Sequence, residues 1–357
     1  MLSEYIKKVV LYKNLSENEA YDCMMQIICG NENEIQISSF LTALSMKGES
    51  VEEITGFVKA MREVSVNVSP QIDMPLVDTC GTGGDYLKTF NVSTISAIIA
   101  ASCGVIIAKH GNRNITSKCG GADILEALGV NINCNANKVE RCMEDAGIGF
   151  IFAPNFHPAM KNVMPIRREI GIRTVFNILG PLTSPARADI QLLGVFDPVF
   201  VGIIAEVLKK LGVKRAMVVH GYDDKGNPAM DEISTIGKTK IAFLDSGKIK
   251  IMELYPEDFG IDKNIKELLI SSNDLDKNVD IALNILKGKT NSKKDLARLD
   301  LCLVNSAAIL FLAGVVTDLH EGVKESYRAV KSGRSIKKLQ EFIKISNNSN
   351  MVLLSPE

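Results

Sequence analysis

Apolar side chains recur at three- and four-residue spacing over roughly the first 68 residues, a period that predicts successive amphipathic helices. Polar breaks at 14–17 and 30–33 divide this stretch, and Ser16 and Ser38 are the expected N-caps. The segment 65–75 contains two prolines and no helical period, which is typical of a linker. We therefore expect a helical domain over residues 1–70 and a second domain over 71–357.

From Leu76 onward, short runs rich in β-branched residues alternate with helical stretches. The expected strands include 104–108, 149–152 and 215–220, and the expected helices lie near 92–102, 122–129, 137–146 and 200–212. This alternation predicts an α/β domain with a central, mainly parallel sheet. Because such sheets bind ligands beyond the carboxyl ends of their strands, the loops after residues 77, 108, 152 and 219 should line one cleft.

Three further segments stand out by their residue types. Residues of about 165–185 carry Arg167, Arg168 and Arg173, and we expect this segment to cross back to the helical domain. Residues 289–298 are basic and polar, which indicates a solvated surface loop. The longest apolar run, 301–316, has 16 residues and contains polar side chains, so it is too short for a membrane span and predicts a buried core helix.

Composition limits the kinds of partner. Lys and Arg number 41 against 42 for Asp and Glu, so no overall field attracts nucleic acid or an anionic membrane, and we expect small-molecule partners. The eight cysteines form no CxxC pair, and the four histidines lie near no cysteine cluster suited to zinc. The first residues lack the apolar core and cleavage site of an export signal, so we expect a cytoplasmic protein with reduced thiols.

Two short stretches together indicate a site for a sugar pyrophosphate. The first, 78–85, is a glycine-rich bend between acids, followed by Ser93 and Thr94 at the start of an apolar helical run. Bare backbone N–H groups in such a bend can approach anionic oxygens. The second stretch, 109–113, follows an expected strand and adds Lys109 and Arg113 with an amide between them. His110 is open to two interpretations, a structural hydrogen bond or proton transfer.

Commoner phosphate motifs do not match this chain. A dinucleotide-binding fingerprint needs glycine at its sixth place, where the run from Gly81 has Tyr86. A P-loop needs a glycine five residues before Gly-Lys-Thr, and the two such triplets have Glu232 and Leu283 there. The sequence therefore gives no support for hydrolysis of ATP or GTP.

Adjacent carboxylates at Asp231 and Glu232 follow an expected strand and are suited to Mg²⁺, which prefers oxygen ligands. A metal ion would also explain why acids lie beside a phosphate-binding bend, since bare carboxylates repel phosphate. Asp223 and Asp224 are rival ligands, but they flank glycine and proline in a turn and are expected on the solvated surface.

The motifs occur in series, as the ranges 81–94, 109–113, 122–129, 157–161, 173–182 and 230–234. In this order, and over nearly the whole chain, they resemble anthranilate phosphoribosyltransferases. The resemblance implies a small N-terminal helical domain on a larger α/β domain, as in nucleoside phosphorylase-like phosphoribosyltransferases, and a homodimer formed through the helical part. The implied reaction transfers the phosphoribosyl group of 5-phosphoribosyl 1-pyrophosphate to the amine of anthranilate, releasing pyrophosphate, in tryptophan biosynthesis.

The resemblance also implies roles for residues at matching positions. The expected phosphoribosyl donor site comprises Gly81, Gly84, Asp85, Thr89, Asn91, Val92, Ser93, Thr94, Lys109, His110, Gly111, Asn112, Arg113, Ser117 and Gly121. The expected anthranilate site comprises Gly81, Asn112, His157 and Arg167, and the expected Mg²⁺ ligands are Ser93, Asp231 and Glu232. No strong acid or base is expected because the aromatic amine is already neutral, and Lys109 should stabilise the charge that develops on the leaving group.

The chain departs from the common family pattern at two places near the expected site. Tyr86 stands where many members have glycine, and Gly121 stands where they have serine, two residues after Cys119. A donor-binding hydroxyl is therefore absent, and the backbone N–H of Gly121 can replace it. Cys80 and Cys119 are expected to be small buried apolar groups rather than redox-sensitive thiols.

Two other functions share this architecture. A pyrimidine nucleoside phosphorylase would place a lysine shortly before the glycine bend, where this chain has 77–80 without one, and it does not require Asp231 and Glu232. A non-catalytic relative could bind a nucleotide or nucleic acid as a regulator. The near-neutral charge and the presence of Asn112 and Arg167 count against that alternative.

Overall fold

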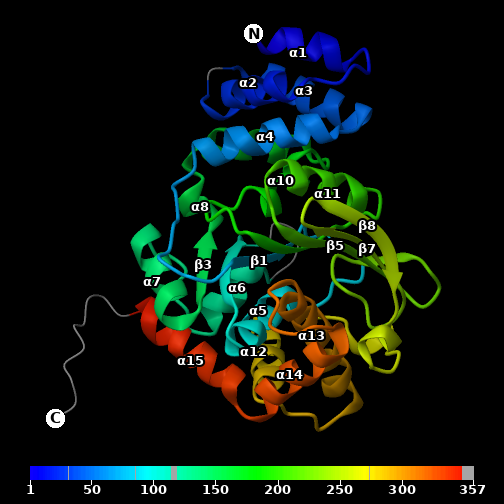
Figure 1. Ribbon diagram of the computed structural model, residues 1–357. Helices are drawn as coiled ribbons and strands as arrows, with labels where there is room; N and C mark the ends of the chain where they lie inside the picture. The colour runs from blue at the N-terminus through cyan, green and yellow to red at the C-terminus, as the bar shows by residue number, and fades with distance from the viewer. Residues whose placement is uncertain (31, 85, 114–118, 273, 348–357) are drawn as a thin grey trace, which may run out of the picture.

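The computed structural model describes residues 1–30, 32–84, 86–113, 119–272 and 274–347. Figure 1 shows the N-terminal helices at one end, a twisted sheet in the middle and a group of C-terminal helices at the other end. The N-terminal helices are α1 (Leu2–Val9), α2 (Glu17–Ile28), α3 (Glu34–Lys47) and α4 (Val51–Glu63). The expected small helical part beside a larger α/β part is confirmed.

Capping side chains define where the N-terminal helices begin. The Ser16 hydroxyl accepts a hydrogen bond from the N–H of Glu19 (3.3 Å), and the Glu19 carboxylate accepts one from the N–H of Ser16 (2.8 Å). The expected cap at Ser38 is wrong, because α3 begins at Glu34 and Asn33 caps it by accepting from the N–H of Gln36 (2.9 Å). Asn33 offers its side-chain oxygen one turn earlier, which leaves Ser38 inside the helix.

The sheet has eight strands, and its core is parallel as expected. The strands are β1 (Leu76–Gly81), β2 (Ile106–Gly111), β3 (Ile148–Phe152), β4 (Ile190–Gly194), β5 (Arg215–Tyr222), β6 (Pro228–Met230), β7 (Thr239–Asp245) and β8 (Lys248–Leu254). Their order is β3-β2-β1-β4-β5-β7-β8, with β6 beside β5. The first five in this order run parallel, whereas β6, β7 and β8 pair in antiparallel fashion.

Three strands extend beyond their expected ends, among them β5, which was expected to end at residue 220 and continues to Tyr222. β1 was expected to end at residue 77 and β2 at 108, but they continue to Gly81 and Gly111. Pairing with neighbours continues to these ends, with Gly81 opposite Gly194 and Gly111 opposite Phe152. Because strand pairing satisfies the backbone whatever the side chain, polar residues such as Lys109 lie within a strand rather than in the loop after it.

The remaining helices surround the sheet. They are α5 (Val92–Ser102), α6 (Gly121–Ala127), α7 (Ala136–Ala146), α8 (Ala153–Phe156), α9 (Met164–Ile170), α10 (Phe176–Leu179), α11 (Phe200–Lys210), α12 (Leu275–Leu286), α13 (Lys293–Leu312), α14 (Leu319–Lys331) and α15 (Arg334–Asn347). Short 3₁₀ turns are η1 (Pro158–Asn162), η2 (Gly180–Leu182), η3 (Pro256–Phe259) and η4 (Lys266–Leu268).

The expected basic loop at 289–298 is wrong over its second half. Helix α13 already begins at Lys293, and the Ser292 hydroxyl caps it by accepting from the N–H of Asp295 (3.1 Å). The buried core helix expected over 301–316 is confirmed over 301–312, the later part of α13, and the helix ends at Leu312. In the described ranges, no helix has the length and apolar character that crossing a bilayer would take.

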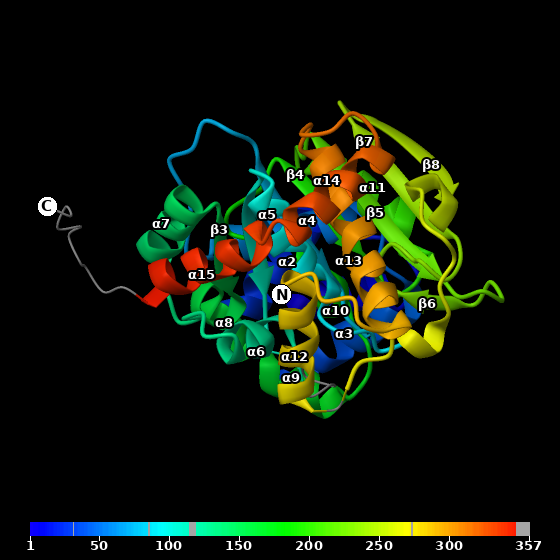
Figure 2. The same ribbon diagram turned by 90° about the horizontal axis from the view of Figure 1, so that it is seen from below.

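Alternating strand residues divide the core between the two faces of the sheet. Leu192 and Val219 face a hydrophobic cluster that contains α5 and α13, whereas Leu193 and Val218 face a cluster that contains α11 and the N-terminal helices. Figure 2 shows α13 crossing the centre of the lower layer, with α12 and α14 on either side. Side chains of 163–182 belong to the second cluster, so this segment packs with the helices α2 to α4.

Candidate active site

A buried lysine lies at the centre of the residues expected to bind the donor. Lys109, on β2, is only 4% exposed, and its ammonium group donates to the carbonyl of Thr79 (2.8 Å) and to the hydroxyl of Ser93 (3.2 Å). Burial lowers the pKa of Lys109, while nearby acids, including Asp78, Asp231 and Glu232, act against that shift. The lysine therefore joins the ends of β1 and β2 to the first turn of α5.

The carboxyl group of Asp78 is buried close to Lys109. Burial raises the pKa of the Asp78 carboxyl to about 7, and the charge of Lys109 partly opposes that rise. The N–H of His110 donates to the carboxylate (3.4 Å), and the side-chain amide of Gln191 also donates to it (3.5 Å). Asp78 was noted in the sequence only as the start of the glycine bend.

Asp231 packs against bare backbone on two neighbouring strands. A Cβ on Gly81 would lie 2.1 Å from the Asp231 carboxylate, and one on Gly194 would lie 1.5 Å from its carbonyl oxygen. These two glycines face each other in the pairing of β1 with β4. The Asp231 carboxylate also accepts a hydrogen bond from the N–H of Gly83 (2.8 Å). The close approach of Asp231 to the glycine bend thus requires glycine on both strands.

Asn305, a polar residue in the mainly apolar helix α13, holds the loop that carries Asp231 and Glu232. Asn305 of α13 is fully buried, accepts from the N–H of Ile233 (3.0 Å) and donates to the Ile233 carbonyl (3.2 Å). Because both backbone groups of Ile233 are satisfied by one side chain, the position of the adjacent acids is fixed.

The N-terminus of α5 contributes Val92, Ser93 and Thr94. Thr94 is buried, and an added Cβ on Gly121 would lie 3.5 Å from its hydroxyl and 4.0 Å from the Lys109 side chain. Gly121 therefore lies against the lysine and the helix start. These distances are ordinary contacts, so the space beside Thr94 would also accept a small side chain.

Two loops of the expected donor site are clamped to each other. The Asn91 amide donates to the carbonyl of Cys119 (3.3 Å), and the Cys119 thiol donates to the Asn91 side-chain oxygen (3.1 Å). Cys119 is half-buried and Cys80 buried, and burial raises the pKa of both thiols, to about 11 for Cys119. Thr89 lies in the same region and pairs with Ile270 across an isolated β-bridge. The expected residues Asp85 and Ser117 lie outside the described ranges.

The motif after β2 forms contacts of its own. Arg113 pairs with Asp123 (2.7 Å) and Glu126 (2.8 Å) of α6, and Asn112 accepts at its side-chain oxygen from the N–H of Arg113 (2.7 Å). Gly111 lies against the ring of Phe150, 2.8 Å from where its Cβ would stand. Arg113 therefore fixes the start of α6, and its charge is largely balanced there.

His110 and His157 form a buried neutral pair. Their rings lie 5.2 Å apart, and burial lowers the pKa of His110 to about 3 and that of His157 to about 4. His110 Nδ1 donates to the carbonyl of Gly180 (3.1 Å), while the Nε2 atoms of both rings are buried without a partner among the described residues. This geometry favours the structural interpretation of His110, since a group that stays neutral near pH 7 does not take up a proton there.

Two arginines come from the segment that returns to the helical part. Arg167 lies on α9, half-buried over the ring of Phe176 (5.1 Å), and burial lowers its pKa. Arg173 donates to the carbonyl of Gly84 (2.9 Å), lies over the ring of Phe196 (4.1 Å) and offers its own carbonyl to the hydroxyl of Ser45 on α3 (3.0 Å). Arg173 thus links the helical part to the glycine bend.

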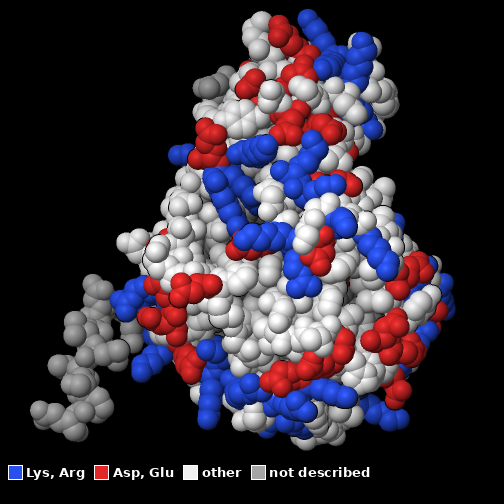
Figure 3. Space-filling view, in the orientation of Figure 1, with Lys and Arg blue, Asp and Glu red and all other residues white. Residues whose placement is uncertain are grey.

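Surface charge agrees with the balanced composition. Figure 3 shows basic and acidic side chains interspersed over the face in view, from the helical end to the C-terminal helices. Among the described residues, the face in view therefore gives no broad basic surface that would attract a polyanion.

Comparison with known families decides between the possible functions. Residues 73–336 match the glycosyl transferase family, a/b domain, and residues 3–65 match the glycosyl transferase family, helical bundle domain. The chain is 49% identical over 343 residues to the anthranilate phosphoribosyltransferase of Methanothermobacter thermautotrophicus, covering 96% of this chain and 97% of that one. The chain belongs to the anthranilate phosphoribosyltransferase family.

Solved structures of anthranilate phosphoribosyltransferases have the same fold. The enzyme from Thermus thermophilus superposes with a TM-score of 0.88 at 37% identity, covering 96% of this chain and 99% of that chain. The enzyme from Saccharomyces cerevisiae, solved in complex with PRPP and Mg, gives a TM-score of 0.85 at 29% identity and covers 97% of each chain.

Within this family context, three contributors were not identified from the sequence. Gly194 admits Asp231, Arg173 holds the glycine bend, and Asn305 holds the loop of the acids. Asn305 carried a detectable signal, because an amide in an apolar helix must find a partner. The other two act through contacts between distant parts of the chain.

The residues around Asp231 fit a hard divalent cation. Ser93, Asp231 and Glu232 offer only oxygen atoms, the donor type that Mg²⁺ prefers. In the described ranges no three or more His, Cys, Asp or Glu side chains gather into a metal-binding group.

Proposed function

We propose that the chain transfers the phosphoribosyl group of 5-phosphoribosyl 1-pyrophosphate to the amine of anthranilate, giving N-(5-phosphoribosyl)anthranilate and pyrophosphate in tryptophan biosynthesis. The observation that carries this proposal is the cluster of Lys109, Ser93 and Asp231 at the carboxyl ends of the central strands. There, bare glycine backbone, a helix start and a buried cation face the same place.

The donor would lie along the glycine bend and the first turn of α5. Breaking the bond between the anomeric carbon and pyrophosphate concentrates negative charge on the leaving group. Lys109 is held by Thr79 and Ser93 before substrate arrives, so its charge needs little reorganisation during the reaction. The expected contacts of Gly81, Gly84, Thr89 and Asn91 with the donor remain part of this proposal.

Ser93, Asp231 and Glu232 would hold Mg²⁺, which neutralises phosphate charge when it is bound. The Asp231 carboxylate accepts a hydrogen bond from the N–H of Gly83 and one from its own backbone N–H, and the remaining lone pairs of its oxygens suit a metal ligand. Burial raises the pKa of Asp231, and a bound cation would favour the charged form.

Anthranilate would be held by Arg167, with Gly81, Asn112 and His157 lining its site. A guanidinium can bind a carboxylate through two parallel hydrogen bonds, and Arg167 is already stacked on Phe176. The neutral histidines cannot act as cations here, so they would shape the site rather than bind the carboxylate. The acceptor amine needs positioning more than deprotonation.

The alternatives have less support. A pyrimidine nucleoside phosphorylase has no use for the buried Asp231 beside the glycine bend, and relatives with close to half of their residues identical are anthranilate phosphoribosyltransferases. A non-catalytic nucleic-acid-binding relative is not favoured by those relatives or by the balanced charge.

We also propose a homodimer formed through the helical part, in the cytoplasm. Val10 and Tyr12 at the end of α1 are 52% and 67% exposed, which leaves apolar surface for a second copy, whereas Val9 is buried in the monomer core. A division of the chain at about residue 70, with 165–185 contributing to the helical domain, is consistent with the shared hydrophobic cluster.

A fluorescence assay tests the proposed reaction. Protein, Mg²⁺, phosphoribosyl pyrophosphate and anthranilate are incubated together, and the loss of anthranilate fluorescence is followed. We expect loss only when all four are present. Unchanged fluorescence with folded protein would contradict the proposed acceptor.

A further inference from the structure

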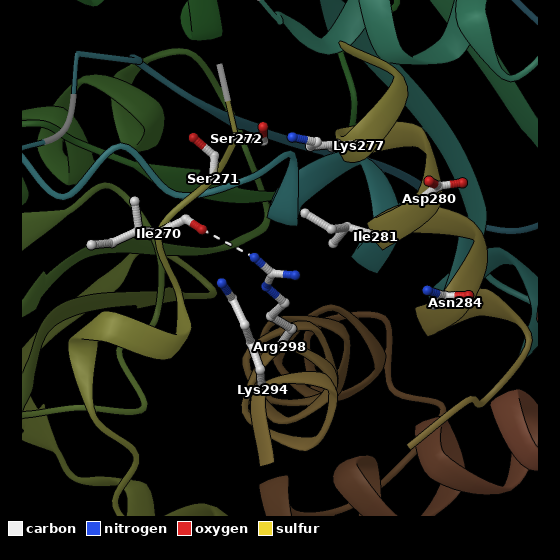
Figure 4. A pocket seen from close by; sticks show the side chains of 9 residues that line it. All are labelled: Ile270, Ser271, Ser272, Lys277, Asp280, Ile281, Asn284, Lys294 and Arg298. Carbon is white, nitrogen blue, oxygen red and sulfur yellow. Dashed lines mark hydrogen bonds between the residues drawn. The ribbon is translucent and has the colours of Figure 1, made fainter. Parts of the chain in front are cut away.

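A separate polar pocket lies between the start of α13, helix α12 and the segment 270–272. It is open to solvent, has a volume of about 420 Å³ and is lined by Lys277, Lys294, Arg298 and Asp280, together with the hydroxyl-bearing residues Ser271 and Ser272. Figure 4 shows Arg298 and Lys294 rising from one side, Lys277 reaching in from α12 and the serines opposite them. Three cations against one acid leave a net charge of +2 among these side chains.

Arg298 has hydrogen-bonding capacity that the protein does not use. One of its terminal nitrogens donates to the carbonyl of Ile270 (3.1 Å), while its Nε is buried without a partner in the described structure. Burial lowers the pKa of Arg298. In the described part of the chain Lys294 forms no ion pair, and Lys277 has only a long one with Asp274 (4.0 Å). Unsatisfied donors and excess positive charge in one pocket favour an anionic ligand.

We propose that this pocket binds a small phosphate monoester and that its occupancy is coupled to the donor loop. Two lysine ammonium groups and a guanidinium approach from different directions, which suits the three terminal oxygens of a phosphate better than a planar carboxylate. The volume accommodates a phosphate with a short polar tail, which the serines and Asp280 can meet with hydrogen bonds.

The pocket wall is built onto the expected donor loop. The N–H of Ser271 donates to the carbonyl of Lys88 (3.1 Å), Ile270 pairs with Thr89, and Arg298 lies over the ring of Phe90 (5.9 Å). A ligand on Arg298 therefore acts directly on the segment 88–90, next to Asn91.

A second connection runs through α12. Asn278 fixes the wall by accepting from the N–H of Ser272 (3.1 Å) and donating to its carbonyl (2.9 Å). Its side chain is also hydrogen-bonded to Cys119, which clamps Asn91. Coupling between the pocket and the donor site is reciprocal, so donor and pocket ligand change each other's affinity by the same factor. This coupling rests on the proposed donor site, whereas binding in the pocket does not.

Calorimetric titration with glycerol 3-phosphate tests the binding. The double variant Lys277→Ala/Lys294→Ala removes two cations that lie on exposed helix positions, so the fold should persist. We expect the double variant to bind glycerol 3-phosphate in this pocket at least about tenfold more weakly, so that one binding site per chain disappears from the isotherm. The matched control Lys293→Ala removes a neighbouring exposed lysine outside the pocket and should bind as the wild type does.

Three results would overturn the binding proposal: no binding by the wild type, an unchanged isotherm in the double variant, or tighter binding of succinate than of glycerol 3-phosphate.

For the coupling, donor affinity is measured with and without glycerol 3-phosphate in the wild type and in the double variant. Competition at the donor site is common to both proteins. For each protein, the donor affinity measured with glycerol 3-phosphate is divided by the donor affinity measured without it. We expect this ratio to differ at least about twofold between the wild type and the double variant, and equal ratios would refute the coupling. A chain that binds no donor at all would instead contradict the proposed function and leave the calorimetric result standing.

Discussion

The carboxylate of Asp231 accepts a hydrogen bond from the backbone N–H of Gly83 at 2.8 Å, which joins the acid-bearing loop to the glycine bend. The contact is possible because Gly81 and Gly194 leave room for Asp231 beside two paired strands. The loop of Asp231 therefore positions both the expected metal ligand and the backbone of the glycine bend, which would face the donor.

Replacing Gly81 with alanine should disrupt this arrangement. Its Cβ would lie 2.1 Å from the Asp231 carboxylate, which must move and lose the bond to Gly83. We expect kcat/KM for the donor to fall at least about 100-fold, measured under steady-state conditions. The control Gly202→Ala lies in α11 with only an ordinary contact at 3.6 Å, and should keep activity while raising stability by about 0.5–1 kcal/mol. Equal activity in the two variants would contradict the account of Gly81.

Asp231→Asn should raise the Mg²⁺ concentration needed for half-maximal rate and reduce kcat/KM at least about 100-fold, since a neutral amide binds Mg²⁺ poorly. The amide oxygen can still accept from Gly83, so the loop should stay in place. Asp224→Asn, on an exposed turn, removes the same charge and should leave the Mg²⁺ titration unchanged. Parallel Mg²⁺ curves for both variants would argue against Asp231 as a ligand.

Arg167→Ala should raise the KM for anthranilate about 10- to 100-fold, because a charge-assisted clamp on the carboxylate is lost. The KM for the donor should change little. Arg168 is the adjacent, exposed arginine of the same helix, so Arg168→Ala is the matched control and should retain normal kinetics. Unaltered anthranilate kinetics in Arg167→Ala would remove the acceptor assignment.

Asp78 should make the wild type less stable as the pH rises. Burial raises its pKa to about 7, above the ordinary 3.8, so between these values the folded chain keeps a proton that the unfolded chain has lost. The contribution of Asp78 is full below about pH 4 and is lost as the pH rises through about 7.

Asp78→Asn has no proton to lose at this position, so its melting temperature should rise relative to that of the wild type as the pH increases from about 4 to about 7. His110 and His157 have lowered pKa values and act in the opposite direction, but they are present in both proteins. Thermal melts at four or more pH values measure the difference. Parallel profiles for the two proteins would contradict the shift.

The sequence predicted those parts of the fold that depend on local pattern. Helix α5 matches its expected range, and the buried part of α13 follows from a long, mainly apolar run. The strands β4, β6, β7 and β8 were not among the expected ones. β6 is only three residues long, and β8 has only exposed and half-buried residues at the sheet edge, so neither gives a strong local signal.

The candidate site shows the same distinction. Lys109 and Asp231 could be proposed from residue type because each follows a strand-like run. The role of Gly194 depends on the pairing of β1 with β4, and that of Arg173 on its hydrogen bond to the carbonyl of Gly84, and neither contact is local in sequence. Strand ends were also misjudged, because pairing with one neighbour, β4 for β1 and β3 for β2, extends these strands through polar residues.

The proposed transfer itself is tested most directly by its stoichiometry. Anthranilate consumed, phosphoribosyl anthranilate formed and pyrophosphate released are measured together by chromatography, with and without a chelator of Mg²⁺. The account predicts equal amounts of all three, and no turnover once the metal is removed. Pyrophosphate release without loss of anthranilate, or equal turnover in the chelator, would contradict it.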